Sequence, residues 1–319
     1  DAAGNNNTAA TQFNWTYDGT APTLSSVSIA SNNSTTTLAK ADDVVTLTFT
    51  ASETIATPVV TFKSGDAAIT DTSVTYENTS GNTWTAVYTT NASDISGAVS
   101  YSIAFSDTVG NAGTAVTNGT GSVTFDKTAP TMAITASGVS DGGTSNDGTL
   151  SLTFTSSEAT TDFAVSDITV SGGSLGALSG SGTTYTATFT PSGDGATTID
   201  VNANTFTDAV GNNNTAATQF NWTYDGTAPT MTITASEVTD GGTSNDGTLS
   251  LTFTASEATT NFVKDDDITV SGGSLGALSG SGTTYTATFT PSGDGATTID
   301  VNANTFTDAV GNNNTAATQ

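Results

Sequence analysis

The sequence predicts an all-β protein made of tandem sandwich modules in an extended array. One reason is a long internal repeat: residues 1–22 recur at 208–229 with a single change, Ala3 against Val210. A second reason is the spacing of the motif Asp-x-Thr-Ala-Pro, which marks units of about a hundred residues, the size of one β-sandwich. The motif begins at Asp18, Asp126 and Asp225. A third reason is that apolar and polar residues alternate in short runs, while no stretch keeps a helical period.

The unit that begins at Asp126 shows the predicted elements in order. Six runs alternate apolar and polar residues, so each is expected to be a strand with one buried face, and a short, weak seventh strand is expected at residues 175–178. These strands are residues 132–136, 150–154, 168–170, 175–178, 185–191, 199–203 and 220–224. Turn-forming stretches rich in Gly, Ser, Asn and Asp separate them. Seven strands with this spacing are typical of an immunoglobulin-like sandwich, whereas a β-helix or a propeller repeats at shorter periods.

The motif spacing sets the expected module boundaries. We expect residues 18–125 to form module 1, 126–224 module 2, and 225–319 module 3 without its own last strand. Residues 1–17 are expected to be the last strand of a preceding module or a donor strand. Module 1 keeps the strand and loop motifs of the others but diverges elsewhere, and it adds a hairpin at residues 78–82.

An aromatic stripe marks the last strand of module 2. Phe220, Trp222 and Tyr224 are two residues apart, so their rings lie on one face of the strand. In a Thr-rich module with few large apolar groups, this face is expected to be core rather than a platform for stacking sugars. The same stripe occurs in residues 8–17, which makes that segment a candidate for strand donation. The aromatic residues of this candidate strand are Phe13, Trp15 and Tyr17.

Charge and composition exclude several classes of function. The net charge is −26, with four lysines and no arginine, so we expect no nucleic-acid binding and no polybasic membrane contact. Cysteine and histidine are absent, which removes disulfides, thiolate or imidazole metal sites, and Ser-His or Cys-His nucleophiles. No run of eighteen apolar residues or export leader is present, so we expect no direct membrane insertion and an origin in the interior of a longer, secreted polypeptide.

The many aspartates in turns suggest calcium as the cofactor. In the sandwich topology, the linker, the loop after the second strand and the loop before the last strand share the N-terminal end of each module. These segments carry candidate oxygen ligands, which suit calcium. The candidates are Asp18, Glu53, Asp107 and Asn111 in module 1; Asp126, Glu158, Asp167, Asp208 and Asn212 in module 2; and Asp225, Glu257, Asp267, Asp308 and Asn312 in module 3.

The C-terminal end of each module is expected to face the next linker with further acids. Its candidates are Asp141 and Asp147 in module 2, with Asp194 beside them, and Asp240 and Asp246 in module 3. Carboxylates packed together repel unless a cation bridges them. The alternative is that these loops are solvated and hold no ion.

Three short motifs resemble those of a known family of repeats. The Asp-x-Thr-Ala-Pro linker, the Leu-Thr-Phe-Thr-x-Ser-Glu strand and the Asp-x-x-Gly-Asn loop resemble the bacterial Ig-like repeats of large secreted adhesins and surface fibres. The resemblance implies rigid extenders at the cell surface, with calcium at or near module junctions. It would place Asp126 and Asp225 as linker ligands at the two complete junctions.

Two functions remain open. The favoured one is a non-catalytic extender of an extracellular adhesin; the alternative is a subunit of a self-assembling filament or surface layer, in which residues 8–17 complete module 3 of a neighbouring chain. The expected partners are neighbouring copies of the same module, in the same chain or another, and the adhesive ligand is not encoded here. An enzyme with two catalytic carboxylates is disfavoured because no long insertion builds a cleft. A carbohydrate-binding module would use exposed aromatics such as Trp84 or Tyr76.

Overall fold

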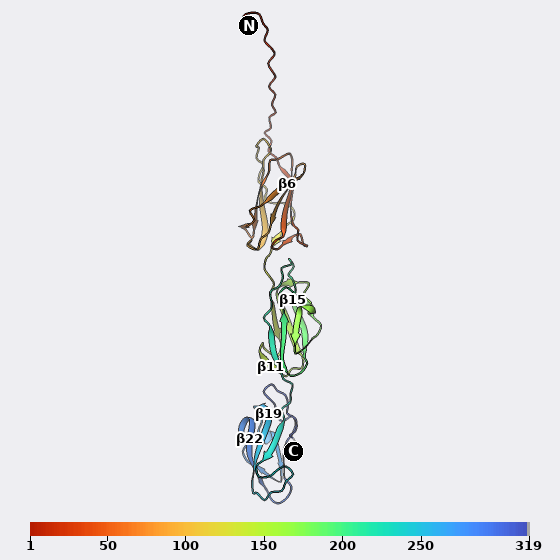
Figure 1. Cartoon of the computed structure of the whole chain (residues 1–319), viewed down its shortest axis with the longest axis vertical. Coiled ribbons are helices and arrows are strands. Elements are labelled where there is room, and N and C mark those ends of the chain that lie inside the picture. Colours follow the sequence, from red (N-terminus) through yellow and green to blue (C-terminus); the bar gives the residue numbers. More distant parts are fainter. Residues whose placement is uncertain (318–319) are drawn as a thin grey trace. The chain divides into compact units, whose positions relative to one another are not determined.

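The computed structural model describes residues 1–317, and its regular secondary structure is almost entirely β-strand (Figure 1). The chain separates into two compact units. The first contains Asp1–Ala129 and the loop Thr207–Asn212; the second contains Pro130–Phe206 and the chain from Asn213 onward. In the described part of the chain, no helix is long and apolar enough to span a membrane.

The first unit holds a sandwich of two antiparallel sheets, with short parallel contacts at the edges. One sheet has the order β1 (Leu24–Ser31), β3 (Val44–Ala51), β7 (Thr83–Thr89) and β6 (Thr75–Ser80). The other has the order β2 (Leu38–Ala39), β9 (Thr124–Phe125), β8 (Gly97–Ala104), β4 (Val59–Ser64) and β5 (Ala67–Ala68). The hairpin between β6 and β7 is the one expected at residues 78–82, and Gly81 at its tip has a positive φ of 57°.

Alternation along the strands builds the core of this unit. In β3 every second residue is buried, and Leu47 and Phe49 are fully covered. They pack with residues of the facing sheet such as Phe62, whose ring lies 4.7 Å from that of Tyr88. Period-two patterning therefore yields a sheet with one apolar face, as expected.

Module 2, in the second unit, is a complete sandwich. One sheet has the order β10 (Met132–Ala136), β12 (Leu150–Thr160), β15 (Ser179–Pro191) and β14 (Gly173–Leu175). The other has the order β11 (Gly143–Ser145), β17 (Phe220–Tyr224), β16 (Gly195–Val201) and β13 (Ile168–Ser171). A single 3₁₀ turn, η1 (Val165–Asp167), precedes β13.

Six of the seven strands expected in module 2 overlap the ranges that the pattern gave, whereas the fourth, expected at residues 175–178, is β14 and shares only Leu175 with that range. The aromatic stripe on the last strand belongs to the core. Phe220 and Trp222 are 4% and 1% exposed, and Tyr224 is half-buried. The short strand β11 is an eighth element that the sequence pattern missed. It pairs in parallel with β17, although it begins at Gly143 within a stretch of turn-forming residues.

Module 3 repeats the first sheet of module 2 as β18 (Met231–Ala235), β19 (Leu249–Thr259), β22 (Ser279–Pro291) and β21 (Gly273–Leu275). Its second sheet contains only β20 (Ile268–Ser271) and β23 (Thr298–Val301), preceded by the helical turn α1 (Lys264–Asp267). Among the described residues, β23 therefore pairs along one edge only.

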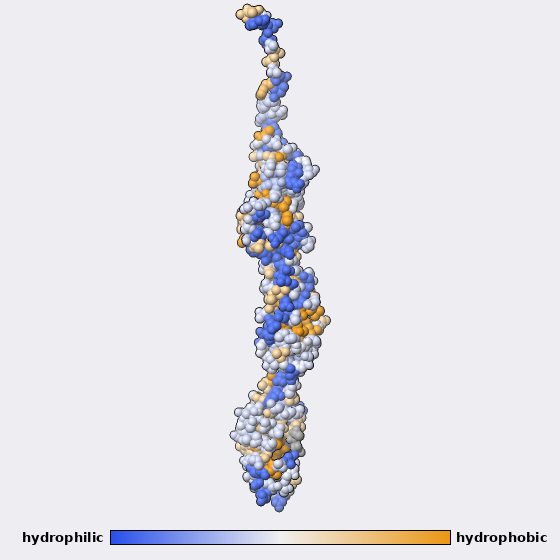
Figure 2. All heavy atoms as spheres, viewed as in Figure 1, coloured by the Kyte–Doolittle hydropathy of each residue, from blue (hydrophilic) through white to orange (hydrophobic). Residues whose placement is uncertain are grey.

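The segment before β1 forms no strand in this chain (Figure 1). Phe13, Trp15 and Tyr17 are 86%, 71% and 78% exposed, and the rings of Trp15 and Tyr17 contact each other edge to face at 6.1 Å. On the face of the chain seen in Figure 2, apolar residues otherwise form only small patches among polar ones.

Candidate metal sites

The loop Asp308–Asn312 is folded around the carboxylate of its first residue. One oxygen of Asp308 accepts hydrogen bonds from the backbone N–H groups of Val310, Gly311 and Asn312 at 2.9, 2.7 and 2.9 Å. The other oxygen accepts one from the Asn312 side-chain amide at 2.9 Å. Gly311 has a φ of +99°, which L-residues rarely adopt. The Asp-x-x-Gly-Asn motif thus encodes a loop that holds a nearly buried carboxylate in a fixed position.

Module 1 contains the same loop, centred on Asp107. Burial acts to raise the pKa of the Asp107 carboxyl, but hydrogen bonds outweigh it and hold this pKa below its ordinary value. These bonds come from the Asn111 side chain and from the backbone N–H groups of Asn111, Gly110 and Val109. Asp107 is therefore ionised at neutral pH and can serve as a cation ligand.

The asparagine of each loop ties the linker to the loop. The Asn312 amide nitrogen donates to the backbone carbonyl of Asp225 at 2.9 Å, and the Asn111 amide nitrogen donates to that of Asp18 at 3.1 Å. The sequence interpretation treated these asparagines as oxygen ligands. In the structure, their amide nitrogens position the linker aspartate beside the loop aspartate.

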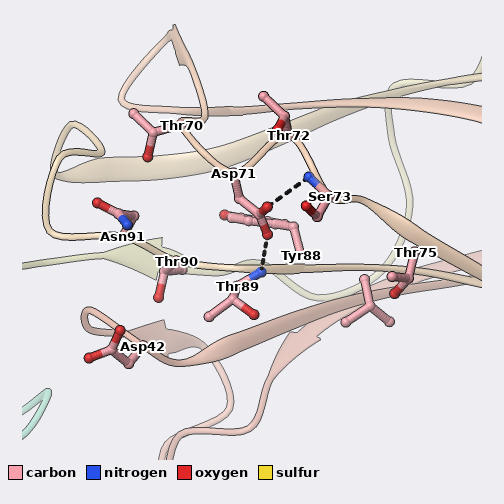
Figure 3. Close-up of a pocket in the computed structure, with 11 residues that line it drawn as sticks. Asp42, Thr70, Asp71, Thr72, Ser73, Thr75, Tyr88, Thr89, Thr90 and Asn91 are labelled. Atoms are coloured by element: carbon pink, nitrogen blue, oxygen red, sulfur yellow. Dashed lines mark hydrogen bonds between the residues drawn. The ribbon is translucent and has the colours of Figure 1, made fainter.

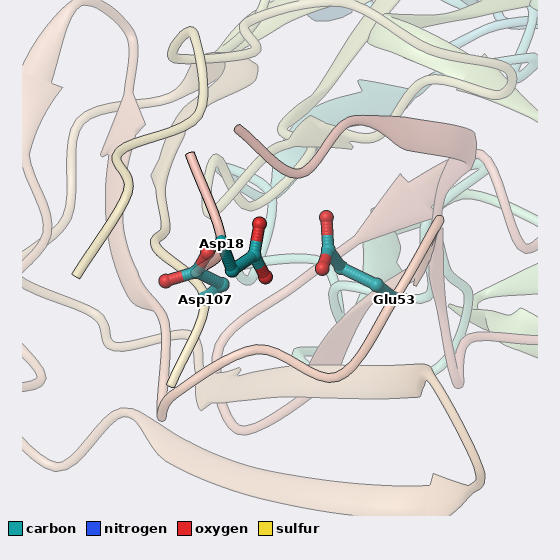
Figure 4. Close-up of side chains that lie close together, drawn as sticks. All are labelled: Asp18, Glu53 and Asp107. Atoms are coloured by element: carbon teal, nitrogen blue, oxygen red, sulfur yellow. The ribbon is translucent and has the colours of Figure 1, made fainter. Parts of the chain in front are cut away.

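A glutamate completes each cluster of three carboxylates. Asp225, Glu257 and Asp308 each offer an oxygen, and these atoms lie within 4.8 Å of one another. Asp18, Glu53 and Asp107 form the matching cluster in module 1, where the Asp18 carboxylate lies between those of Glu53 and Asp107 (Figure 4). Glu257 projects from the long strand β19, whereas the sequence reading placed it in the loop after a shorter strand.

Module 2 repeats the linker and loop part of this arrangement. Within the first unit, the Asn212 amide donates to the carbonyl of Asp126 at 3.1 Å and to the carboxylate of Asp208 at 2.9 Å. Glu158 occupies the sequence position that corresponds to Glu257 but belongs to the second unit.

The pKa of Glu257 reflects the repulsion between the carboxylates of the module 3 cluster. Partial burial raises the pKa of its carboxyl, and the neighbouring charges of Asp225, Asp308 and Asp194 raise it further. The ionised cluster is thus under mutual repulsion, which a bound cation would relieve.

This repulsion predicts a specific pH dependence in the absence of divalent cations. The pKa of Glu257 is raised in the folded state above its ordinary value of 4.5. Between pH 4.5 and the raised pKa, the folded state therefore binds more protons than the unfolded chain does. The contribution of Glu257 to stability should therefore fall as pH rises from 4.5 through the raised pKa. The difference in unfolding free energy between wild type and Glu257→Gln, measured by urea titration from pH 4 to 8, should show this slope. Asp265→Asn, which removes an exposed charge that forms a 3.7 Å ion pair with Lys264 outside the cluster, controls for the loss of one negative charge.

Asp194 joins module 2 to the linker before module 3. Its carboxylate accepts a hydrogen bond from the N–H of Gly226 at 2.8 Å and another from the hydroxyl of Thr227. The hydrogen bonds from Thr227 and Gly226 lower the pKa of Asp194. Asn146 adds a second link, since its amide donates to the Asn312 side-chain oxygen at 3.2 Å. An acidic C-terminal end was expected to face the next linker, but the partners of Asp194 are backbone and hydroxyl donors.

Contacts of Lys40 and Asn33 were missed by the sequence reading. Within the first unit, the Lys40 ammonium donates to the carbonyl of Gly211 at 2.7 Å, and the Asn33 amide donates to that of Val210 at 3.0 Å. No motif distinguishes these two residues, because module 1 diverges from its neighbours in this loop.

The remaining candidates lie outside the carboxylate clusters. Asp167 and Asp267 accept hydrogen bonds from the backbone N–H groups of Ala164 and Val263 at 2.8 and 2.5 Å, so they fix the short turns η1 and α1. The candidates at the C-terminal ends of the modules form hydrogen bonds within turns or to a strand, or line a groove. Asp147 and Asp246 bond the hydroxyls of Ser145 and Ser244, Asp141 accepts the N–H of Asn221, and Asp240 lines a groove.

The donor set fits calcium better than other biological metals. Each cluster supplies three carboxylates with no nitrogen or sulfur ligand, a combination that favours hard cations over zinc or copper. Calcium also accepts six to eight oxygens in irregular geometry, which the linker, loop and strand residues could provide together with water.

A separate pocket of about 510 Å³ lies in module 1 (Figure 3). At its centre, the Asp71 carboxylate accepts the N–H groups of Ser73 and Thr89 at 2.7 and 3.0 Å. Both hydrogen bonds lower the pKa of the Asp71 carboxyl, and the one from Thr89 has the larger effect. Asp71 is therefore a poor general acid. Burial and the charge of Asp94 raise the pKa of the Tyr88 phenol, whose hydroxyl has no hydrogen-bond partner among the described residues.

The aromatic residues considered for carbohydrate binding pack against the core. Trp84 and Tyr76 are half-buried beside the module 1 core, and the Tyr76 hydroxyl accepts the N–H of Val60 at 3.0 Å.

The sequence model of the Bacterial Ig-like domain family matches residues 126–224 and again 225–319. The chain belongs to this family. Among solved structures, the bacterial integrin-binding protein invasin is 15% identical, with a TM-score of 0.35 over 87% of this chain and 56% of that one. InvD of Yersinia pseudotuberculosis is 16% identical, with a TM-score of 0.37 over 86% and 81%. Titin domains I67–I69 are 10% identical, with a TM-score of 0.32 over 93% and 97%. No curated protein matches the sequence.

Proposed function

We propose that this chain is a non-catalytic structural extender of an extracellular bacterial adhesin or surface fibre, with calcium at its module junctions. Tandem bacterial Ig-like modules with small cores and polar surfaces suit a spacer that holds a binding domain away from the cell. The acidic composition and the absence of cysteine are compatible with this location.

The observation that carries the calcium proposal is the recurrence of one cluster in separate modules. Asp18, Glu53 and Asp107 in module 1 match Asp225, Glu257 and Asp308 in module 3, and the motifs that carry them are kept although module 1 diverges elsewhere. Three ionised carboxylates this close repel by roughly 1 kcal/mol or more for each pair. A bound divalent cation turns that repulsion into attraction.

Calcium is expected to stiffen the linker as well as to stabilise the module. Asp225 lies in the linker between modules 2 and 3, while Glu257 and Asp308 belong to module 3 itself. An ion shared by these residues would restrict linker motion, in addition to the hydrogen bonds that Asp194 makes with Gly226 and Thr227.

Adding calcium to the chelated protein should raise the thermal unfolding midpoint. Each site occupied at a hundredfold excess over Kd adds about 2.7 kcal/mol to the stability of the folded state. Glu257→Gln should reduce this shift by removing a ligand, yet leave the calcium-free module as stable as wild type or more so, because it also removes repulsion. Asp265→Asn removes an equal charge outside the cluster and should keep the full shift.

Calorimetry with calcium and with chelator measures these midpoints, and small-angle scattering follows linker stiffness. An unchanged midpoint together with an unchanged maximum dimension would exclude the calcium part of the proposal.

A second candidate is a subunit of a self-assembling extracellular filament or surface layer. The observation that favours it is the exposure of Phe13, Trp15 and Tyr17, whose counterparts Phe220 and Trp222 are core residues in module 2. Such a function requires a complementary surface on another chain.

A further inference from the structure

The two complete junctions, before module 2 and before module 3, are built on equivalent backbone contacts. The N–H of Asp126 donates to the carbonyl of Ala39 at 2.8 Å, and the N–H of Asp225 donates to that of Ser145 at 3.1 Å. Each acceptor belongs to a short strand that runs parallel to the last strand of its module, β2 beside β9 and β11 beside β17. The residue that follows each acceptor therefore occupies the same place at the two junctions.

That residue is a lysine at the first junction and an asparagine at the second. The Lys40 ammonium donates to the carbonyl of Gly211 at 2.7 Å, and the N–H of Gly211 donates to the Asp208 carboxylate at 2.7 Å. The Asn146 amide instead contacts the loop of module 3 through the side-chain oxygen of Asn312. A single residue thus lies between a positive charge and the loop carboxylate at the first junction, whereas the corresponding contact at the second junction is neutral.

Module 1 holds this lysine toward the loop. The Asp43 carboxylate accepts the backbone N–H of Lys40 and the side-chain amide of Asn33, both at 2.8 Å. Asn33 in turn donates to the carbonyl of Val210, a residue that is 8% exposed. The loop 207–212 accordingly belongs to the compact unit that contains module 1. Hydrogen bonds of the chain itself therefore fix this loop in place.

A second pair of equivalent positions differs in charge in the same direction. At the first junction, the N–H of Lys127 donates to the Ser96 hydroxyl at 3.2 Å. At the second, the N–H of Gly226 donates to the Asp194 carboxylate at 2.8 Å. Burial and neighbouring charges raise the pKa of Glu257 in the module 3 cluster, and Asp194 is one of those charges. The second junction thus has an anion, within electrostatic reach of its cluster, where the first has a hydroxyl.

We propose that Lys40 is a built-in cation: it holds the first junction without calcium and weakens calcium binding there, whereas the second junction depends on calcium. This inference rests on the calcium sites of the proposed function and adds that the two junctions differ in affinity. A calcium ion bound by Asp208 would be repelled by the Lys40 ammonium, while Asp194 would attract an ion at the second junction. As calcium is withdrawn, flexibility should therefore appear at the second junction first.

Two full-length variants isolate the two sites in the intact chain. Asp107→Asn combined with Asp308→Asn leaves the Asp208 site, and Asp107→Asn combined with Asp208→Asn leaves the Asp308 site. Isothermal titration calorimetry with calcium chloride should give a dissociation constant at least about tenfold higher for the Asp208 site, because a unit charge near a divalent ion changes its binding by this order. Equal dissociation constants in the two backgrounds would overturn the inference.

Exchanging the two equivalent residues tests the charge of Lys40 itself. In the background that keeps the Asp208 site, Lys40→Asn should lower the dissociation constant about tenfold, while Lys40→Arg should leave it unchanged. In the background that keeps the Asp308 site, Asn146→Lys should raise it by about the same factor. A damaged fold cannot produce the tighter binding of Lys40→Asn, and Asn33→Ala, which removes the neighbouring contact without a change of charge, should not tighten binding. An unchanged constant in Lys40→Asn, or equal tightening in Lys40→Arg, would contradict the role of the charge.

Pairs of spin labels on introduced cysteines report the stiffness of each junction, because the chain contains no native cysteine. Labels at the exposed strand positions Thr61 and Ser151 span the first junction, and labels at Ser151 and Ser250 span the second. With chelator, the distribution of distances should be narrow across the first junction and broad across the second, and calcium should narrow only the second. Lys40→Asn should broaden the first distribution in chelator, and calcium should restore it. Equal narrowing by calcium at both junctions of the otherwise unchanged chain would refute the proposal.

The titrations distinguish a failure of this inference from a failure of the proposed function. If neither background binds calcium, the proposed calcium sites are excluded and the inference falls with them. If both backgrounds bind calcium with equal affinity and Lys40→Asn changes nothing, the calcium sites stand and only the difference between the junctions is excluded.

Discussion

Replacing Trp222 with alanine is expected to lower the free energy of unfolding of module 2 by about 3–5 kcal/mol. The Trp222 ring is 1% exposed and contacts the rings of Phe189 and Tyr224 edge to face, at centroid distances of 6.3 and 5.9 Å. Truncation would leave a cavity between the two sheets. Strands β11 and β16, which flank β17, would also lose packing contacts there. Urea unfolding followed by circular dichroism measures the loss, since the two remaining tryptophans, Trp15 and Trp84, lie outside module 2.

Trp15→Ala is the matched control, because Trp15 has the same five neighbours on each side but is 71% exposed. At concentrations where the chain is monomeric, this substitution should leave the unfolding free energy within about 0.5 kcal/mol of wild type. A similar loss for both variants would mean that the segment around Trp15 is packed against the folded chain. Comparing the two variants shows how much of the change in unfolding free energy depends on burial of the tryptophan, because the sequence around it is the same in both places.

Period-two patterning was sufficient to predict the sandwich, because burial follows side-chain alternation directly. In β12 the apolar residues Leu150, Leu152 and Phe154 are buried while the residues between them face outward. The turn signals between such runs then predicted the order of seven of the eight strands in module 2. Strand β11 escaped this reasoning, since Gly143–Ser145 pairs through its backbone and carries no apolar alternation.

The carboxylate clusters could be predicted only in part. Topology brings the linker, the second strand and the last loop to one end of a module, which is enough to place Asp225, Glu257 and Asp308 near one another. Individual bonds decide the rest. Asp267 is also an acidic residue and was expected at a similar loop position. Its carboxylate instead accepts a hydrogen bond from the nearby backbone N–H of Val263. Alternation and loop position cannot distinguish a carboxylate that caps a turn from one that faces another loop.

Asp308→Ala is expected to cost module 3 roughly 2–4 kcal/mol even without calcium. Its carboxylate, which is 5% exposed, accepts three backbone N–H groups and the Asn312 amide. Alanine would leave these donors without an acceptor in a loop where water has little access, and it would release Asn312 from the position that holds Asp225. Asp246→Ala, at an exposed residue bonded to Ser244, should change stability by about 0.5 kcal/mol or less.

Asp308→Asn separates the role of this side chain in the loop from its role in the cluster. The amide oxygen can still accept the backbone N–H groups of Val310 and Gly311, so the loss should be about 1 kcal/mol, smaller than for alanine. Its NH₂ group, however, faces the Asn312 amide and cannot ligate a cation, so the calcium-induced rise in the unfolding midpoint should be lost in both variants. Thermal unfolding with and without chelator measures both effects. If Asp308→Asn kept the full calcium response, the ion would not be bound by this carboxylate, and the buried charge would serve only to fold the loop.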